Sequence, residues 1–168
     1  MNLAEIEKEA GRLSEDTLHT EQQHFIAAKW WMRCHYGLGL IATIAGVLAT
    51  RNAVSSSLQV DQPWIAPSVV TVIGAVIAFL RPDGKSELHH DKGVRYNDLR
   101  RKLRVFIKIT LPETDRNRDN ANAIDKLNFF EDLKTSLNRE KPIAPSGLIY
   151  FLAKREIEQG HTRHVVDE

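Results

Sequence analysis

The chain has 168 residues, enough for one ordinary domain, and a formal net charge of +1, so its total charge indicates neither a nucleic acid nor an acidic partner. Its mean hydropathy of −0.33 would suit a soluble protein, but this average combines two apolar segments with charged ends. The single cysteine, Cys34, excludes an intramolecular disulfide and a cysteine-based zinc site.

The first 33 residues have the pattern of a cytoplasmic amphipathic helix. Leu3, Ile6, Ala10 and Leu13 recur at spacings of three and four residues, which places them on one helical face. The start of the chain is acidic and lacks the basic segment, apolar core and small-residue cleavage site of a signal peptide. We therefore expect residues 1–33 to form a helix outside the membrane.

Two uncharged segments follow and predict a transmembrane hairpin over residues 34–80. Seventeen residues without a fixed charge separate Arg33 from Arg51, and nineteen separate Asp61 from Arg81. A spanning helix needs about 17–25 residues, so we expect spans at residues 34–50 and 64–80. The alternative is a pair of buried helices in a soluble bundle. Burying two helices that are apolar all round would need more covering surface than this chain offers.

The distribution of Lys and Arg predicts the orientation of the hairpin. The segment between the spans carries one basic residue, Arg51, whereas Lys29 and Arg33 precede the first span and eight basic residues follow the second, from Arg81 to Arg104. Basic residues near membrane ends remain on the cytoplasmic side. We therefore expect an integral membrane protein with both termini in the cytoplasm.

Each predicted span has a face of small residues. On a helical wheel they gather opposite the large apolar side chains, and the candidate packing or pore-lining residues are Gly39, Thr43, Gly46, Thr50, Ser68, Thr71, Gly74 and Ala78. Small residues allow close helix packing in lipid, so these faces pack the hairpin against itself or a neighbour, or line a narrow polar path in an oligomer. Neither span contains Asp, Glu, Lys or Arg, which argues against a proton relay or a coupled transporter.

Residues 81–111 are expected to form a cytoplasmic helix after a turn at residues 81–84, with Ser86 as a plausible N-cap. The residues Tyr96, Leu99, Leu103 and Phe106 form a heptad-like seam that continues to Thr110, and Pro112 should end the helix. Such a seam pairs with another helix, here the N-terminal helix or a copy of itself in a neighbouring subunit. We therefore consider it a candidate oligomerisation seam.

The same helix carries a basic patch. Residues 81–108 contain nine Lys or Arg and four Asp or Glu, and the patch itself consists of Arg95, Arg100, Arg101, Lys102 and Arg104. Basic residues near a membrane surface attract anionic lipid. The patch is therefore a candidate contact for lipid or for an acidic protein or nucleotide ligand, although no glycine-rich phosphate-binding loop accompanies it.

The remainder of the chain, residues 112–168, predicts a polar linker, a helix from about Ile124 to Leu137, a further short helix over residues 146–159 and a flexible tail. The adjacent pair His89 and His90 is not expected to make a metal site, because neighbouring side chains on a helix point about 100° apart. His161 and His164 stand three residues apart in a tail with nothing to hold them rigid. We expect no catalytic residue, no metal, no cofactor and no enzymatic activity.

The layout resembles a known family. Trp30-Trp31 lead into a first span that opens with Tyr36-Gly37-Leu38-Gly39-Leu40. The helix after the second span has a recurring pattern at spacings of three or four residues, made by His90, Gly93, Tyr96, Leu99 and Leu103, with Arg104 directly after it. This resembles the SLATT family of two-transmembrane effectors in bacterial conflict systems, over roughly residues 20–155.

The resemblance implies a homo-oligomer in the lipid bilayer of the bacterial inner membrane, which makes a pore or otherwise disrupts the membrane during anti-phage defence. It also implies a nucleotide-generating, nucleotide-sensing or other defence partner, without direct binding of nucleic acid. The residues alone are equally compatible with a non-conducting membrane anchor or assembly factor for such a partner.

Overall fold

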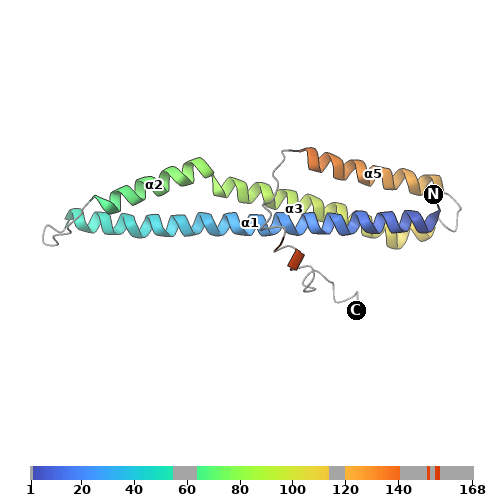
Figure 1. Ribbon diagram of the computed structural model, residues 1–168, viewed down its shortest axis with the longest axis horizontal. Helices are drawn as coiled ribbons and strands as arrows, with labels where there is room; N and C mark the ends of the chain where they lie inside the picture. The colour runs from blue at the N-terminus through green and yellow to red at the C-terminus, as the bar shows by residue number, and fades with distance from the viewer. Residues whose placement is uncertain (1, 55–63, 114–119, 141–150, 152–153, 156–168) are drawn as a thin grey trace. The chain divides into compact units, whose positions relative to one another are not determined.

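The computed structural model describes residues 2–54, 64–113, 120–140, 151, 154 and 155. Within these ranges the secondary structure is helical, which confirms the expected all-α class (Figure 1). The elements are α1 (Leu3–Val54), α2 (Ile65–Leu80), α3 (Pro82–Val105), the π-helical segment η1 (Phe106–Thr110) and α5 (Asn120–Arg139). The helix predicted at residues 146–159 lies largely outside the described residues.

The expected N-terminal helix and first span are one continuous helix, α1. No proline occurs before Pro63, so nothing removes a hydrogen bond from the helical ladder where the chain changes from polar to apolar. The boundary at residue 33 is therefore a change of composition. The chain forms two compact units, a charged unit of residues 1–27 and 89–168 and an apolar unit of residues 28–88.

The break between α2 and α3 is confined to Arg81. This residue has left-handed backbone angles, φ 45° and ψ 59°, and its N–H donates to the carbonyl of Ile77 at 2.9 Å. Pro82 then begins α3, because its fixed φ suits the first helical position. The expected turn at residues 81–84 is thus a single residue. Ser86 is not an N-cap, since it lies inside α3 and its hydroxyl donates to the carbonyl of Ala28 at 2.9 Å.

The charged unit has a core formed by three helices: the start of α1, then α3 with η1, and α5 (Figure 1). Its buried residues are Ile6, Ala10, Leu13, Tyr96, Leu99, Leu103, Phe106, Leu111, Ala123, Leu127, Phe130 and Leu137. All four residues of the expected seam belong to this core, with exposed fractions of 2% or less. The seam therefore packs within the chain, against α1 and α5, and is not available to a neighbouring subunit.

The π-helical turn shifts the buried face of α3 by one residue. The backbone N–H of Leu111 donates to the carbonyl of Phe106, and these two residues are both buried although they stand five apart. The expected spacing placed Thr110 at this position. Pro112 does not end the helix, which continues to residue 113. Because Pro112 has no backbone N–H, the ladder of helical hydrogen bonds is interrupted at this residue. A π turn next to the interruption accommodates one extra residue in the helix.

Gly93 lies so close to the Phe25 ring that a larger residue would not fit. A Cβ atom at Gly93 would lie 2.9 Å from Cδ1 and Cε1 of the Phe25 ring, whereas a Cβ at Gly11 would meet nothing within 4 Å. Gly93→Ala should therefore lower the free energy of unfolding by about 1–3 kcal/mol through overpacking. Gly11→Ala, the matched control, should leave it unchanged or raise it by up to about 1 kcal/mol. Denaturant unfolding in detergent, followed by circular dichroism, measures both, and equal stabilities would contradict the close contact.

Candidate functional site

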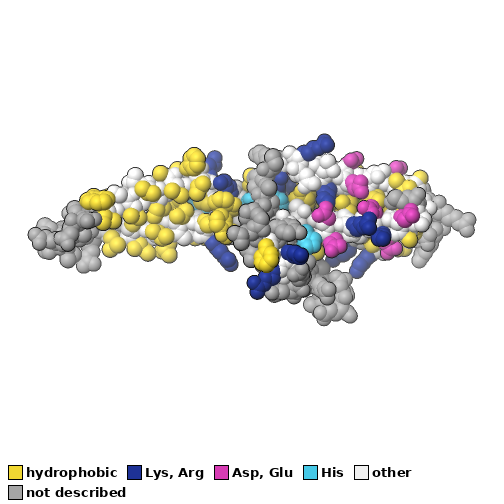
Figure 2. Space-filling view, viewed as in Figure 1, with side chains coloured by type: hydrophobic (Ala, Val, Ile, Leu, Met, Phe, Trp, Pro, Cys, Tyr) yellow, Lys and Arg dark blue, Asp and Glu magenta, His cyan; other side chains and the backbone are white. Residues whose placement is uncertain are grey.

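The apolar unit exposes most of its large hydrophobic side chains. Two helical stretches, Leu3–Thr50 and Pro67–Glu113, each contain an 18-residue window long and apolar enough to cross a membrane, and only 6% of each window is buried within the chain. Figure 2 shows yellow side chains spread over the surface of α2 and the apolar part of α1. A core helix of a soluble protein would be mostly buried instead. The exposed residues include Tyr36, Leu40, Ile44, Val47, Val72 and Phe79.

The small faces of the two spans are not fully buried within the chain. Gly39 and Gly46 are half-buried, while Thr43, Thr50, Ser68, Thr71, Gly74 and Ala78 are exposed. A Cβ atom added at Gly39, Gly46 or Gly74 would meet nothing within 4 Å. Among the residues that the structure describes, nothing therefore packs closely against these glycines.

The hydroxyl groups on these faces already have hydrogen-bond partners. Thr43 donates to the carbonyl of Gly39 at 2.8 Å and Thr50 to that of Gly46 at 2.9 Å. In α2, Ser68 and Thr71 likewise donate to carbonyls four residues earlier. Such bonds satisfy a hydroxyl within its own helix. The hydroxyls thus tolerate lipid and require no water.

A buried polar cluster lies in the charged unit. Nδ1 of His24 on α1 is 2.9 Å from Nδ1 of His89 on α3, and the ring of His24 stacks on Tyr96 with centroids 5.6 Å apart. One nitrogen of the pair must accept a hydrogen bond, so both rings cannot be protonated there without repulsion. Burial, followed by the charges of His89 and Lys92, lowers the pKa of His24 to about 4, and burial also lowers the pKa of His89.

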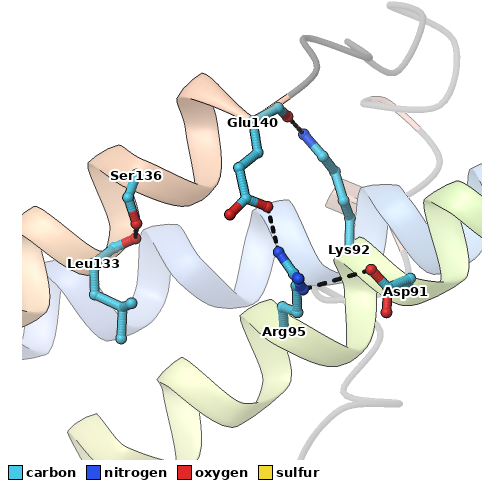
Figure 3. A network of polar contacts seen from close by, with 6 residues as sticks. All are labelled: Asp91, Lys92, Arg95, Leu133, Ser136 and Glu140. Carbon is cyan, nitrogen blue, oxygen red and sulfur yellow. Dashed lines mark hydrogen bonds and ion pairs between the residues drawn. The ribbon is translucent and has the colours of Figure 1, made fainter.

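The end of α5 is held by cations from α3 (Figure 3). The ammonium of Lys92 donates to the backbone carbonyl of Glu140, and Arg95 pairs with the Glu140 carboxylate and, at 3.5 Å, with Asp91. A cation is stabilising at the negative C-terminal end of a helix. Burial lowers the pKa of Lys92, while the Glu140 carboxylate opposes this shift.

The five residues of the basic patch do not act as one surface. Besides Arg95, Arg100 is also paired within the chain: its Nε lies 2.8 Å from the buried Glu21 carboxylate. Arg101, Lys102 and Arg104 are exposed. The first two of these line a groove of about 690 Å³ between α3 with η1 and α5.

Glu21 and His24 belong to a buried cluster that was not predicted from the sequence. A signal was present, because the buried face of α1 continues through Thr17, Glu21 and His24 at spacings of four and three residues. Their polarity obscured that periodicity. Among the described residues no group of three or more His, Cys, Asp or Glu is placed to hold a metal ion, and the pair of imidazoles gives only two nitrogen ligands.

The histidine pair predicts a pH dependence of stability. An unfolded His24 would have a pKa near 6.5 and the folded one has a pKa of about 4, so the unfolded chain binds more protons between these values. Stability should be constant above about pH 7 and fall by up to about 3 kcal/mol as the pH drops from 6.5 to 4. Thermal unfolding in detergent at pH 7.5, 6 and 5 measures this. His24→Gln should flatten the profile, and a wild-type profile in that variant would contradict the assignment.

Comparison with protein-family models, with curated proteins and with solved structures found no match to this chain. Its function is therefore inferred from its own residues and geometry.

Proposed function

We propose that this chain is an oligomeric effector of the bacterial inner membrane that permeabilises the membrane when a partner or ligand triggers it. The observation that carries this proposal is the exposure of two apolar helical stretches on a chain that also has a folded, charged unit. Exposed apolar surface of this extent needs a cover. Lipid is the cover that fits helices of this length and composition.

Placing residues 34–50 and 65–80 in lipid satisfies their backbone polar groups, since an α-helix pairs its N–H and carbonyl groups internally. The excess of Lys and Arg outside the segment between the spans supports a hairpin with both termini in the cytoplasm. The charged unit would then lie on the cytoplasmic side.

Permeation requires several copies, because two helices per chain cannot enclose a channel. The faces containing Gly39, Thr43, Gly46 and Thr50 in α1, and Ser68, Thr71, Gly74 and Ala78 in α2, leave room for a neighbouring helix. Small residues favour such packing in lipid. A path along the α1 face would carry no charge, so it should select weakly and could close by loss of water.

An open pore would kill its host, so the resting assembly must be closed. Opening needs a trigger that binds the open state more tightly than the closed one. The charged unit is the sizeable surface for such a signal. The resemblance of the layout to SLATT effectors supports a trigger from a nucleotide-generating, nucleotide-sensing or other defence partner.

The second candidate function is a non-conducting membrane anchor or assembly factor. The observation that favours it is the internal bonding of the hydroxyls on the small faces. Because these groups need no water, both faces could be covered by lipid or by another helix. The two functions differ in a single measurable property, the membrane potential of triggered cells.

Topology is the first test of the membrane assignment. In a Cys34→Ser background, Ser56→Cys should react with an impermeant thiol reagent added outside, whereas Asn117→Cys should react only after the membrane is opened. Both positions lie outside the described residues, in the segments that precede α2 and α5. Labelling of intact cells at Asn117→Cys but not at Ser56→Cys would reverse the orientation.

Triggered depolarisation tests the effector function. Expression with the activated partner system should collapse the membrane potential and stop growth. Thr43→Leu should prevent this by blocking the α1 face, while leaving insertion intact, because the Thr43 side chain is exposed and bonds only its own helix. Val47→Leu adds bulk on a highly exposed part of the same helix and serves as the control. A potential maintained in triggered wild-type cells would exclude the pore and favour the anchor.

A further inference from the structure

The groove between α3 with η1 and α5 combines an aromatic floor with cations at both ends. Phe106 and Phe130 are buried at its base, whereas Val105 and Phe129 are 51% and 60% exposed along it. Arg101 and Lys102 line the groove from α3, and Lys126 lines it from α5. Among the described residues of the lining, Asp98 is the one that is acidic. An occupant should therefore present acidic groups on either side of a small or apolar centre.

The contacts of the three helices give the register of the groove. The contacts His24–His89 and Glu21–Asn97 make α3 antiparallel to α1, and Tyr96–Asn138 with Phe106–Phe130 make it antiparallel to α5. Hence α1 and α5 run parallel. The ion pair of Asp16 with Lys134 shows that a residue of α1 lies level with the residue of α5 that is 118 positions later in the chain.

With this offset Lys126 is level with residue 8 of α1, and Phe129 is level with Gly11. Lys102 lies opposite about residue 133 of α5, at the level of about residue 15 of α1. The two cationic ends of the groove are therefore separated by about 11 Å along the helices.

The outer face of α1 matches this spacing. Glu7, Gly11 and Glu15 are exposed and fall within an arc of about 80°. The two carboxylates stand about 12 Å apart along the axis, and a Cβ atom at Gly11 would meet nothing within 4 Å, so the centre of the face is open. Neither carboxylate takes part in an ion pair or hydrogen bond within the described chain.

We infer that a second copy of this chain occupies the groove, with the Glu7–Gly11–Glu15 face of its α1 between α3 and α5. Glu7 of one copy then meets Lys126 of the next, Gly11 meets the Phe129 ring, and Glu15 meets Lys102. This inference rests on the proposed homo-oligomer and names the contact that builds it.

The positions of these residues along the helix axes support a second copy as the occupant of the groove. Each acidic residue of α1 is level with its cation within the same chain, so copies standing side by side in parallel need no lengthwise shift to pair them. Copies inserted into a membrane in one direction satisfy this condition. The contact joins two different faces, and such head-to-tail contacts generate closed rings when the rotation closes. Opposite charges at both ends of the groove also fix the register.

Disulfide trapping tests the contact in membranes of cells that carry Cys34→Ser copies. A copy with Gly11→Cys and a second, differently tagged copy with Phe129→Cys should form a mixed disulfide, because both substitutions lie at the proposed contact and neither disturbs the core. Each variant expressed alone should remain monomeric under denaturing conditions. Arg12→Cys with Phe129→Cys is the matched control, since residue 12 points about 100° away from residue 11, and it should give little product.

Charge reversal provides the second arm. Lys102→Glu with Lys126→Glu should lower the disulfide yield on the order of tenfold, as should Glu7→Lys with Glu15→Lys, since both pairs become repulsive. A chain carrying all four reversals should recover most of the yield.

Three results would overturn the inference. The first is a disulfide between two Gly11→Cys copies, and the second is a disulfide to a protein of another mass. The third is the absence of the mixed disulfide under conditions in which an amine cross-linker still gives a ladder of wild-type oligomers. The absence of any ladder would instead remove the homo-oligomer, and the proposed function with it.

Discussion

The described part of the chain leaves its two apolar helical stretches largely uncovered, and the other features of the structure depend on this constraint. An 18-residue apolar window in each long helical stretch is only 6% buried, so a cover for these side chains must come from outside the described residues. Removing apolar surface from water contributes about 25 cal/mol per Å², and such a cover would therefore stabilise the two helical stretches. We propose lipid as this cover, and the small faces of the two predicted spans leave room for further copies.

The charged unit differs in that it buries its apolar side chains within itself. Its core is a single layer of Leu, Ile, Ala and aromatic side chains between three helices. Next to this core lies a polar layer in which His24 faces His89, and Glu21 pairs with Arg100. Breaking a buried pair by removing one partner is costly. The layer therefore specifies which residues of α1 and α3 face each other more strongly than apolar contacts would.

The same helices leave one face of this unit incomplete. Val105 and Phe129 remain exposed between cations at the two ends of the groove, while the Glu7–Gly11–Glu15 face of α1 carries two carboxylates and no large apolar side chain. Two faces of one unit thus have complementary charge at equal heights. In the proposed membrane assembly, where copies share a direction of insertion, such a unit would favour association side by side and would thereby gather the predicted spans together.

The sequence by itself determined the helical class, the two apolar segments and the helical face that includes Tyr96, Leu99 and Leu103, because these depend on composition and on a period of 3.6 residues. Only the tertiary structure decided that this face is filled by the chain's own α1 and α5, that a π turn moves its last buried residue from Thr110 to Leu111, and that Arg100 is paired with Glu21. Periodicity shows that a face needs a partner, but the identity of the partner depends on contacts between residues that are far apart in the sequence.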